Sequence, residues 1–231
     1  MDLANLFSTI DLVALCWFVA AWVGYAILVD FTSYGRGSLN ARMNAYRDWW
    51  MKEMMARDVR IVDTQINASL QNGTAFFAST SLIAIGATLT LLRATEEIMS
   101  VVGSLPFVLP VSAALWELKL MGLTVVFAYA FFKFAWSYRL FNYVAILLGA
   151  APPPEHNDTP VARAHMRRTA LLTASAGRHF NRGQRALFFA VGYLGWFVSP
   201  WLLIVTTAAV LLVMWRRQFA SDAHHAVASE M

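Results

Sequence analysis

Apolar residues along this chain gather in four long runs, which are separated by segments that hold most of the charge. The runs cover residues 12–29, 73–92, 120–138 and 186–215. A helix needs about 20 mainly apolar residues to cross the hydrocarbon core of a bilayer, and each run is close to that length or longer. The pattern therefore predicts an all-α fold, a polytopic integral membrane protein with about four transmembrane helices.

The segments beside these runs also have helical periodicity. From residue 39 to residue 70, apolar side chains recur every three or four positions, which is typical of an amphipathic helix. We expect this helix to bend near Met54, where the apolar stripe changes register. The third run can stay helical from residue 110 to Gly149, about 60 Å at 1.5 Å per residue. Both features predict long helices that extend from the membrane into the cytoplasm.

We predict a single helical membrane domain over residues 1–217, followed by a flexible C-terminal tail over residues 218–231. The fourth run allows two arrangements. It can form one span, which is the count that we favour. It can also form a hairpin that turns near Ser199 and Pro200, because proline interrupts a helix.

Composition and charge add an environment and an orientation. The chain is 58% hydrophobic with a mean hydropathy of +0.52, which is too apolar for an ordinary soluble domain. Of the 18 lysine and arginine residues, six lie in the connection 30–72 and seven in the connection 139–185. The positive-inside rule puts both connections in the cytoplasm and both termini outside. Arg216 and Arg217 argue against this orientation, because they close the fourth run on what would be the outer side.

The second basic connection contains a candidate anion-binding site. If the fourth helix begins near Phe180, the free N–H groups and positive dipole of its N-terminus attract an anion. Arginine can hold phosphate oxygens through two parallel hydrogen bonds. The residues expected to bind an anion or a lipid headgroup here are Arg178, His179, Asn181, Arg182 and Arg185. The alternative is a diffuse attraction of the whole connection to anionic lipid.

A second group of polar residues lies on one face of the helix before the second run. These residues stand three or four positions apart and are Arg60, Asp63, Thr64 and Asn67. They can form a cytoplasmic polar seam that packs on the second basic connection, with Arg60 and Asp63 as an ion pair. The alternative is an ordinary solvated helix face.

No motif in the chain indicates a cofactor or a catalytic residue. There is one cysteine, and no CxxC, HExxH or GxxxxGK[ST] pattern occurs. We therefore expect no metal site, no cofactor and no catalytic residue. Nucleic acid is not an expected partner, because the basic clusters lie next to predicted spans.

Two segments carry a resemblance to a known family. ARDVRIVDTQINASLQNGTAFFASTSLIAIGA begins at Ala56, and RHFNRGQRALFFAVGYLGWF begins at Arg178. In these segments the chain resembles the domain-of-unknown-function 599 family of small bacterial and plant membrane proteins. The resemblance implies a multi-pass membrane protein, here assigned to the bacterial inner (plasma) membrane, and it implies no activity.

Three kinds of function follow as hypotheses. The favoured one is a non-enzymatic scaffold or interaction protein with a basic cytoplasmic face. The first alternative is an oligomeric anion channel or transporter, suggested by the hydroxyl-bearing residues of the second run. The second alternative is an enzyme that acts on phosphorylated lipid headgroups, with His179 and the nearby arginines as its candidate groups. The expected partners are the lipid bilayer, its anionic headgroups and further copies of the chain in a homo-oligomer.

Overall fold

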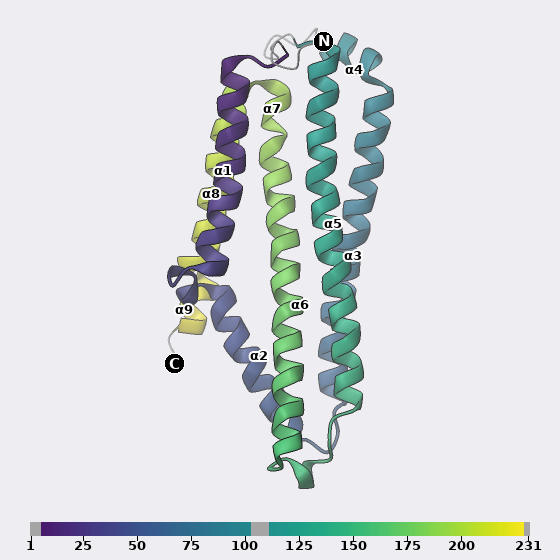
Figure 1. Ribbon diagram of the computed structural model, residues 1–231, viewed down its shortest axis with the longest axis vertical. Helices are drawn as coiled ribbons and strands as arrows, with labels where there is room; N and C mark the ends of the chain where they lie inside the picture. The colour runs from purple at the N-terminus through teal and green to yellow at the C-terminus, as the bar shows by residue number, and fades with distance from the viewer. Residues whose placement is uncertain (1–5, 103–110, 229–231) are drawn as a thin grey trace.

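The computed structural model describes residues 6–102 and 111–228, and every regular element in these ranges is a helix (Figure 1). The six long helices are α1 (Thr9–Phe31), α2 (Leu39–Met55), α3 (Ile61–Arg93), α5 (Ala113–Gly149), α6 (Pro160–Tyr193) and α8 (Pro200–Phe219). Short helices connect or extend them: η2 (Tyr34–Gly37), α4 (Thr95–Val102), η3 (Pro154–His156), α7 (Gly195–Val198) and α9 (Asp222–Ala228).

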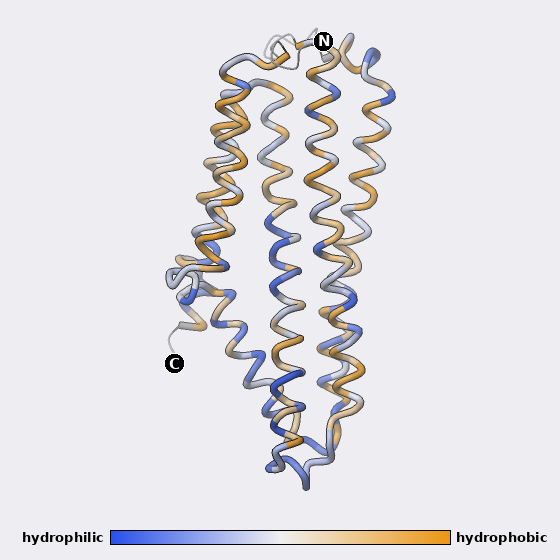
Figure 2. Tube along the Cα trace, viewed as in Figure 1, coloured by the Kyte–Doolittle hydropathy of each residue, from blue (hydrophilic) through white to orange (hydrophobic). Residues whose placement is uncertain are grey.

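The helices form an elongated bundle with two different halves. Three helices, α3, α5 and α6, run along most of its length, whereas α1 and α8 flank them in one half and α2 in the other (Figure 1). The half with α1 and α8 is mainly hydrophobic, and we call it the apolar half. Hydrophilic residues gather in the middle of α6 and in the polar half, where α2 lies (Figure 2).

Four helices among the described residues are long and apolar enough to cross a membrane, as the sequence predicts. They are Thr9–Phe31, Ile61–Arg93, Ala113–Gly149 and Pro200–Val227. The end of α6 runs beside them through the apolar half (Figure 1). Aromatic side chains fill the space between α1 and α6: the ring of Phe18 packs edge-on against those of Phe189 and Tyr193.

The prediction of one helix over residues 186–215 is wrong, and the hairpin is right. Ser199 has extended backbone angles, φ −162° and ψ 156°, and caps α8, whose first residue is Pro200. Proline disfavours a helical conformation in the residue before it and is favoured at the first position of a helix. The chain therefore reverses, and α8 returns along α1, where Tyr25 donates to the carbonyl of Met214 at 3.1 Å.

This reversal changes the predicted orientation of the chain. The start of α1 and the end of α8 now lie at opposite ends of the apolar half (Figure 1). Arg216 and Arg217 close α8 next to η2 and α2, at the same level as the other basic residues. Arg216 and Arg217 argued against a prediction that placed both termini outside, and their positions are therefore consistent with the observed fold.

The tail also differs from the prediction of a flexible segment over residues 218–231. Helix α8 continues to Phe219, and Asp222–Ala228 forms α9. A ring nitrogen of His224 lies 2.9 Å from the carbonyl oxygen of Gly37. Residues 229–231 lie outside the described residues.

The predicted helix over residues 39–70 is interrupted rather than bent. Helix α2 ends at Met55 and α3 begins at Ile61. The guanidinium of Arg60 lies in the gap and donates to the carbonyl oxygens of Met54, Ala151 and Pro152. It thereby ties the end of α2 to the end of α5, so the chain cannot continue as one helix.

The polar seam packs against the C-terminal part of α5. Asp63 is fully buried and accepts hydrogen bonds from Trp50 at 2.7 Å and from Arg57 at 2.6 Å, so the predicted pairing of Arg60 with Asp63 is wrong. Asn67 is 2% exposed and donates to the carbonyl of Phe141. The hydroxyl of Thr64 is exposed and donates to the carbonyl of Ile61, one turn earlier in the same helix. Three of the four predicted residues therefore hold elements together.

We predict that Asp63→Ala lowers the free energy of unfolding by about 2–3 kcal/mol, because it removes a buried carboxylate that accepts two partly buried hydrogen bonds, one of them charged. The melting temperature of the detergent-purified protein measures this loss. Asp48→Ala is the control, since Asp48 is exposed in α2. Equal melting temperatures for the two variants would contradict a structural role for Asp63.

Candidate functional site

The predicted anion-binding residues lie in the middle of α6, not at a helix start. Helix α6 is continuous from Pro160, whose preceding residue Thr159 is the N-cap, to Tyr193. The prediction of a helix N-terminus near Phe180 is therefore wrong. Gly177 lies within this helix, close to Arg47: a Cβ there would lie 2.7 Å from the guanidinium carbon, so a larger residue would displace that side chain.

Two of the predicted arginines share one carboxylate. Arg182 donates to Asp30 at 2.9 Å, and Arg185 donates to the other oxygen of Asp30 at 3.0 Å. Arg185 is 4% exposed, and its guanidinium lies 5.3 Å from the centre of the Tyr25 ring. A buried guanidinium needs such compensation, because an unpaired buried charge is costly. Asp30 therefore neutralises Arg185 and reduces the charge available at Arg182.

His179 lies on a different side of α6, facing α5. Its ring packs edge-on against Trp136, with ring centres 6.4 Å apart. Burial lowers the pKa of His179, and the nearby charges of Lys133, Arg182 and Arg178 lower the pKa further. A lowered pKa favours the neutral imidazole, and the ring of His179 packs against α5.

The other two predicted residues, Arg178 and Asn181, line a cavity of about 270 Å³ between α6 and the start of α2. We call it the larger cavity, because a smaller cavity adjoins it. Its remaining lining comes from the end of α1, from η2 and from the first turns of α2, and is Val29, Asp30, Phe31, Thr32, Gly35, Arg36, Ser38, Asn40, Ala41 and Asn44. Gly35 permits the tight return of η2 onto α1, since a Cβ there would lie 2.1 Å from the carbonyl oxygen of Val29.

The larger cavity has an excess of positive charge. The guanidinium groups of Arg36 and Arg178 make no hydrogen bond or ion pair within residues 6–102 and 111–228. Ser38 caps α2, so the N-terminus of this 17-residue helix also points its partial positive charge at the cavity. Burial lowers the pKa of neighbouring Arg47, and the charge of Arg178 lowers it further. These groups together favour an anion in the cavity.

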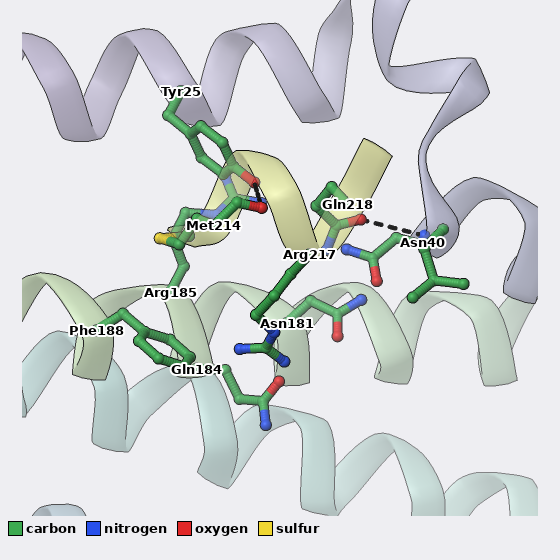
Figure 3. A pocket seen from close by; sticks show the side chains of 10 residues that line it. Tyr25, Asn40, Asn181, Gln184, Arg185, Phe188, Met214, Arg217 and Gln218 are labelled. Atoms are coloured by element: carbon green, nitrogen blue, oxygen red, sulfur yellow. Dashed lines mark hydrogen bonds between the residues drawn. The ribbon is translucent and has the colours of Figure 1, made fainter. Parts of the chain in front are cut away.

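A smaller cavity of about 180 Å³ adjoins the larger one through Asn40 and Asn181, which line both. Figure 3 shows the side chain of Arg217 extending from α8 toward α6, where its guanidinium lies 4.9 Å from the centre of the Phe188 ring. Gln218 accepts a hydrogen bond from the backbone N–H of Asn40 at 3.3 Å. The smaller cavity thus adds Arg217, the Asp30-paired Arg185 and several amide groups to the same region.

Comparison with known proteins identifies the family of the chain. The family model described as "Protein of unknown function, DUF599" matches residues 13–223. The chain belongs to the DUF599 family. The matched region includes every residue that lines the two cavities in this DUF599 protein. No curated protein and no solved structure matches the chain.

Several residues of this region did not stand out in the sequence. Arg36 and Asn40 are 138 or more positions away from Arg178 and Asn181 along the chain, and Arg217 lies in a separate helix, so no local spacing joins them. Asp30 carried one signal: it is the only acidic residue between Asp11 and Asp48, and it ends an apolar run. A lone carboxylate at such a position predicts a basic partner.

We predict that Asp30 and Arg185 are energetically coupled. Asp30→Asn should lower the melting temperature by several degrees, because it leaves a buried guanidinium without a full counter-charge. The double variant Asp30→Asn with Arg185→Gln should be more stable than the sum of the two single losses implies, by about 1 kcal/mol or more. Additive losses in this double-mutant cycle would contradict the coupling. Asp58→Asn, at an exposed position, is the control for the loss of one carboxylate.

Proposed function

We propose that this DUF599 protein is a non-enzymatic membrane scaffold that binds the phosphorylated headgroup of an anionic lipid in the larger cavity. One observation carries the proposal: two arginines without acidic partners, Arg36 and Arg178, face a helix N-terminus across one cavity. Arginine binds phosphate oxygens through paired hydrogen bonds, and backbone N–H groups at a helix start bind the same oxygens.

Lipid is favoured over a soluble phosphate because of where the cavity lies. It sits at the end of α1, where the apolar half of the bundle gives way to polar residues (Figure 2). Phe31 lines the cavity and is 75% exposed, and Ile27, one turn earlier in α1, is 51% exposed. A lipid can place its headgroup in the cavity while its acyl chains lie along this apolar face.

The proposed membrane orientation puts the cavity in the cytoplasm. Four helices could cross a membrane by length and composition, and the two basic connections lie on the same side of the apolar half as Arg216 and Arg217. By the positive-inside rule this is the cytoplasmic side. Anionic lipids give the cytoplasmic leaflet its negative surface potential, so the proposed ligand and its site face each other.

The two alternative functions find less support in the geometry. Ser81 is buried in α3, whereas Thr80 and Thr90 are exposed, and all three hydroxyls donate to a carbonyl of the preceding turn of the same helix. These hydroxyls are the residue type that suggested a channel. His179, the suggested catalytic group, faces α5 and does not line either cavity.

We predict that Arg178→Gln weakens the binding of phosphatidylglycerol to the purified protein by tenfold or more, and that Arg36→Gln has a similar effect. A charge-assisted hydrogen bond contributes about 1.5–3 kcal/mol, which corresponds to tenfold or more in the dissociation constant. Binding of a fluorescent phosphatidylglycerol to protein in neutral detergent measures the effect.

Arg163→Gln is the matched control, since it removes one exposed charge from the same basic connection. Diffuse attraction contributes about 1 kcal/mol for any basic residue near the surface, so this variant should lose fivefold or less. Similar losses in Arg163→Gln and Arg178→Gln would overturn the defined site. Equal affinity for glycerol phosphate and for the lipid would replace the lipid with a soluble ligand.

We also predict that the C-terminal helix lies in the cytoplasm. In a Cys16→Ala background, cysteines introduced one at a time at Ser69, Ser175 and Ser221 should be protected from a membrane-impermeant reagent in intact cells. A cysteine at Ser100, in α4 at the opposite end of the bundle, should react with it. Labelling at Ser221 without labelling at Ser69 would contradict the proposed orientation.

A further inference from the structure

A lysine is buried at the end of the bundle farthest from the two cavities. Lys119 in α5 is 1% exposed, and its ammonium donates to the carbonyl oxygen of Trp196 at 2.8 Å. An ammonium group has three N–H donors. The ammonium also lies 5.2 Å from the centre of the Trp196 ring, and its other two N–H groups find no hydrogen-bond acceptor within residues 6–102 and 111–228.

These donors lie beside a cavity of about 540 Å³, which we call the outer cavity. Its polar lining is Ser8, Asp11, Ser112, Lys119 and Ser199, and the rest of the described lining is apolar. The apolar side chains include Ile10, Leu115 and Val198. The outer cavity therefore combines one buried cation with an extensive hydrophobic wall.

Three helix N-termini converge on the outer cavity. Ser8, Ser112 and Ser199 are the N-caps of α1, α5 and α8, and each hydroxyl accepts a hydrogen bond from a backbone N–H of its own helix. All three serines line the cavity. Each helix start carries about half a positive charge, so the three dipoles act in the same sense as the ammonium of Lys119.

The one carboxylate in the described lining is already occupied. One oxygen of Asp11 accepts from the backbone and the hydroxyl of Ser8, and the other accepts from the indole N–H of Trp196 at 2.7 Å. Asp11 makes no ion pair with Lys119. The formal charges of Asp11 and Lys119 offset each other, so the excess positive charge in the outer cavity comes from the three helix starts.

We propose that the outer cavity binds an amphipathic carboxylate, with its head on Lys119 and its hydrocarbon chain on the apolar lining. The three helix starts attract a monoanion, and the two N–H groups of Lys119 that have no acceptor among the described residues can donate to its two carboxylate oxygens. A free acid from the outer solution and a fatty acid dissolved in the bilayer present the same chemistry. This site is separate from the lipid site proposed above and does not depend on it.

The test uses full-length protein in phosphatidylcholine nanodiscs, titrated calorimetrically with sodium octanoate, with empty nanodiscs subtracted. Acetate carries the head alone and 1-octanol the chain alone, so both should bind at least tenfold more weakly than octanoate. Absence of octanoate binding above the empty nanodiscs would overturn the proposal, and so would equal binding of 1-octanol. Because these measurements use the wild-type chain, they do not depend on the folding of a variant.

Lys119→Met should weaken octanoate binding at least tenfold. Lys133→Met is the matched control, since it makes the same change in the same helix, where Lys133 lies over the ring of Tyr129. Equal weakening in both variants would overturn the role of Lys119. Nanodiscs preloaded with palmitate distinguish the sources: loss of octanoate binding there identifies a bilayer acid as a competing ligand, and unchanged binding identifies the free acid.

Discussion

The buried ion pair between Asp30 and Arg185 is the interaction on which the middle of the bundle depends. Helix α6 is continuous, so its arginines must enter the region where α1 and α8 surround it. A guanidinium in such a place requires a counter-charge, and Asp30 supplies it from the end of α1. The pair thereby fixes the register of α1 against α6, and it fixes where the chain leaves α1 for η2 and α2.

That register creates the cavities as a consequence. Once Asp30 is held by Arg182 and Arg185, the tight return at Gly35 brings the start of α2 over α6. The arginines one turn away on α6 and in η2 then have no acid left to pair with, and they face the N-terminus of α2. An ion pair that is structural therefore leaves a neighbouring pair of cations without an acidic partner among the described residues, as the proposed lipid site requires.

The two ends of the apolar half carry different cationic side chains. Near the polar half, arginines with planar, multidentate guanidinium groups line open cavities, which suits a phosphate group. At the other end, one lysine is enclosed among helix starts and apolar side chains. A lysine ammonium is a compact point charge, which suits a smaller monoanion. The two proposed ligands follow from this difference in cation chemistry and enclosure.

The sequence by itself determined the helical class, the number of candidate spans and the side on which basic residues gather. These properties depend on hydropathy and periodicity within short windows, and a bilayer imposes a minimum length on each span. The signals for the turn at Ser199 and Pro200 were also local, although the count of one span was favoured over them.

The tertiary structure alone decided which cations are paired. Arg185 donates to Asp30, 155 positions away, and Lys119 donates to the carbonyl of Trp196, 77 positions away. Asp63 pairs with Arg57 and not with Arg60. Such pairings depend on how helices pack against one another, and the spacing of residues along a single helix carries no information about a partner on another helix.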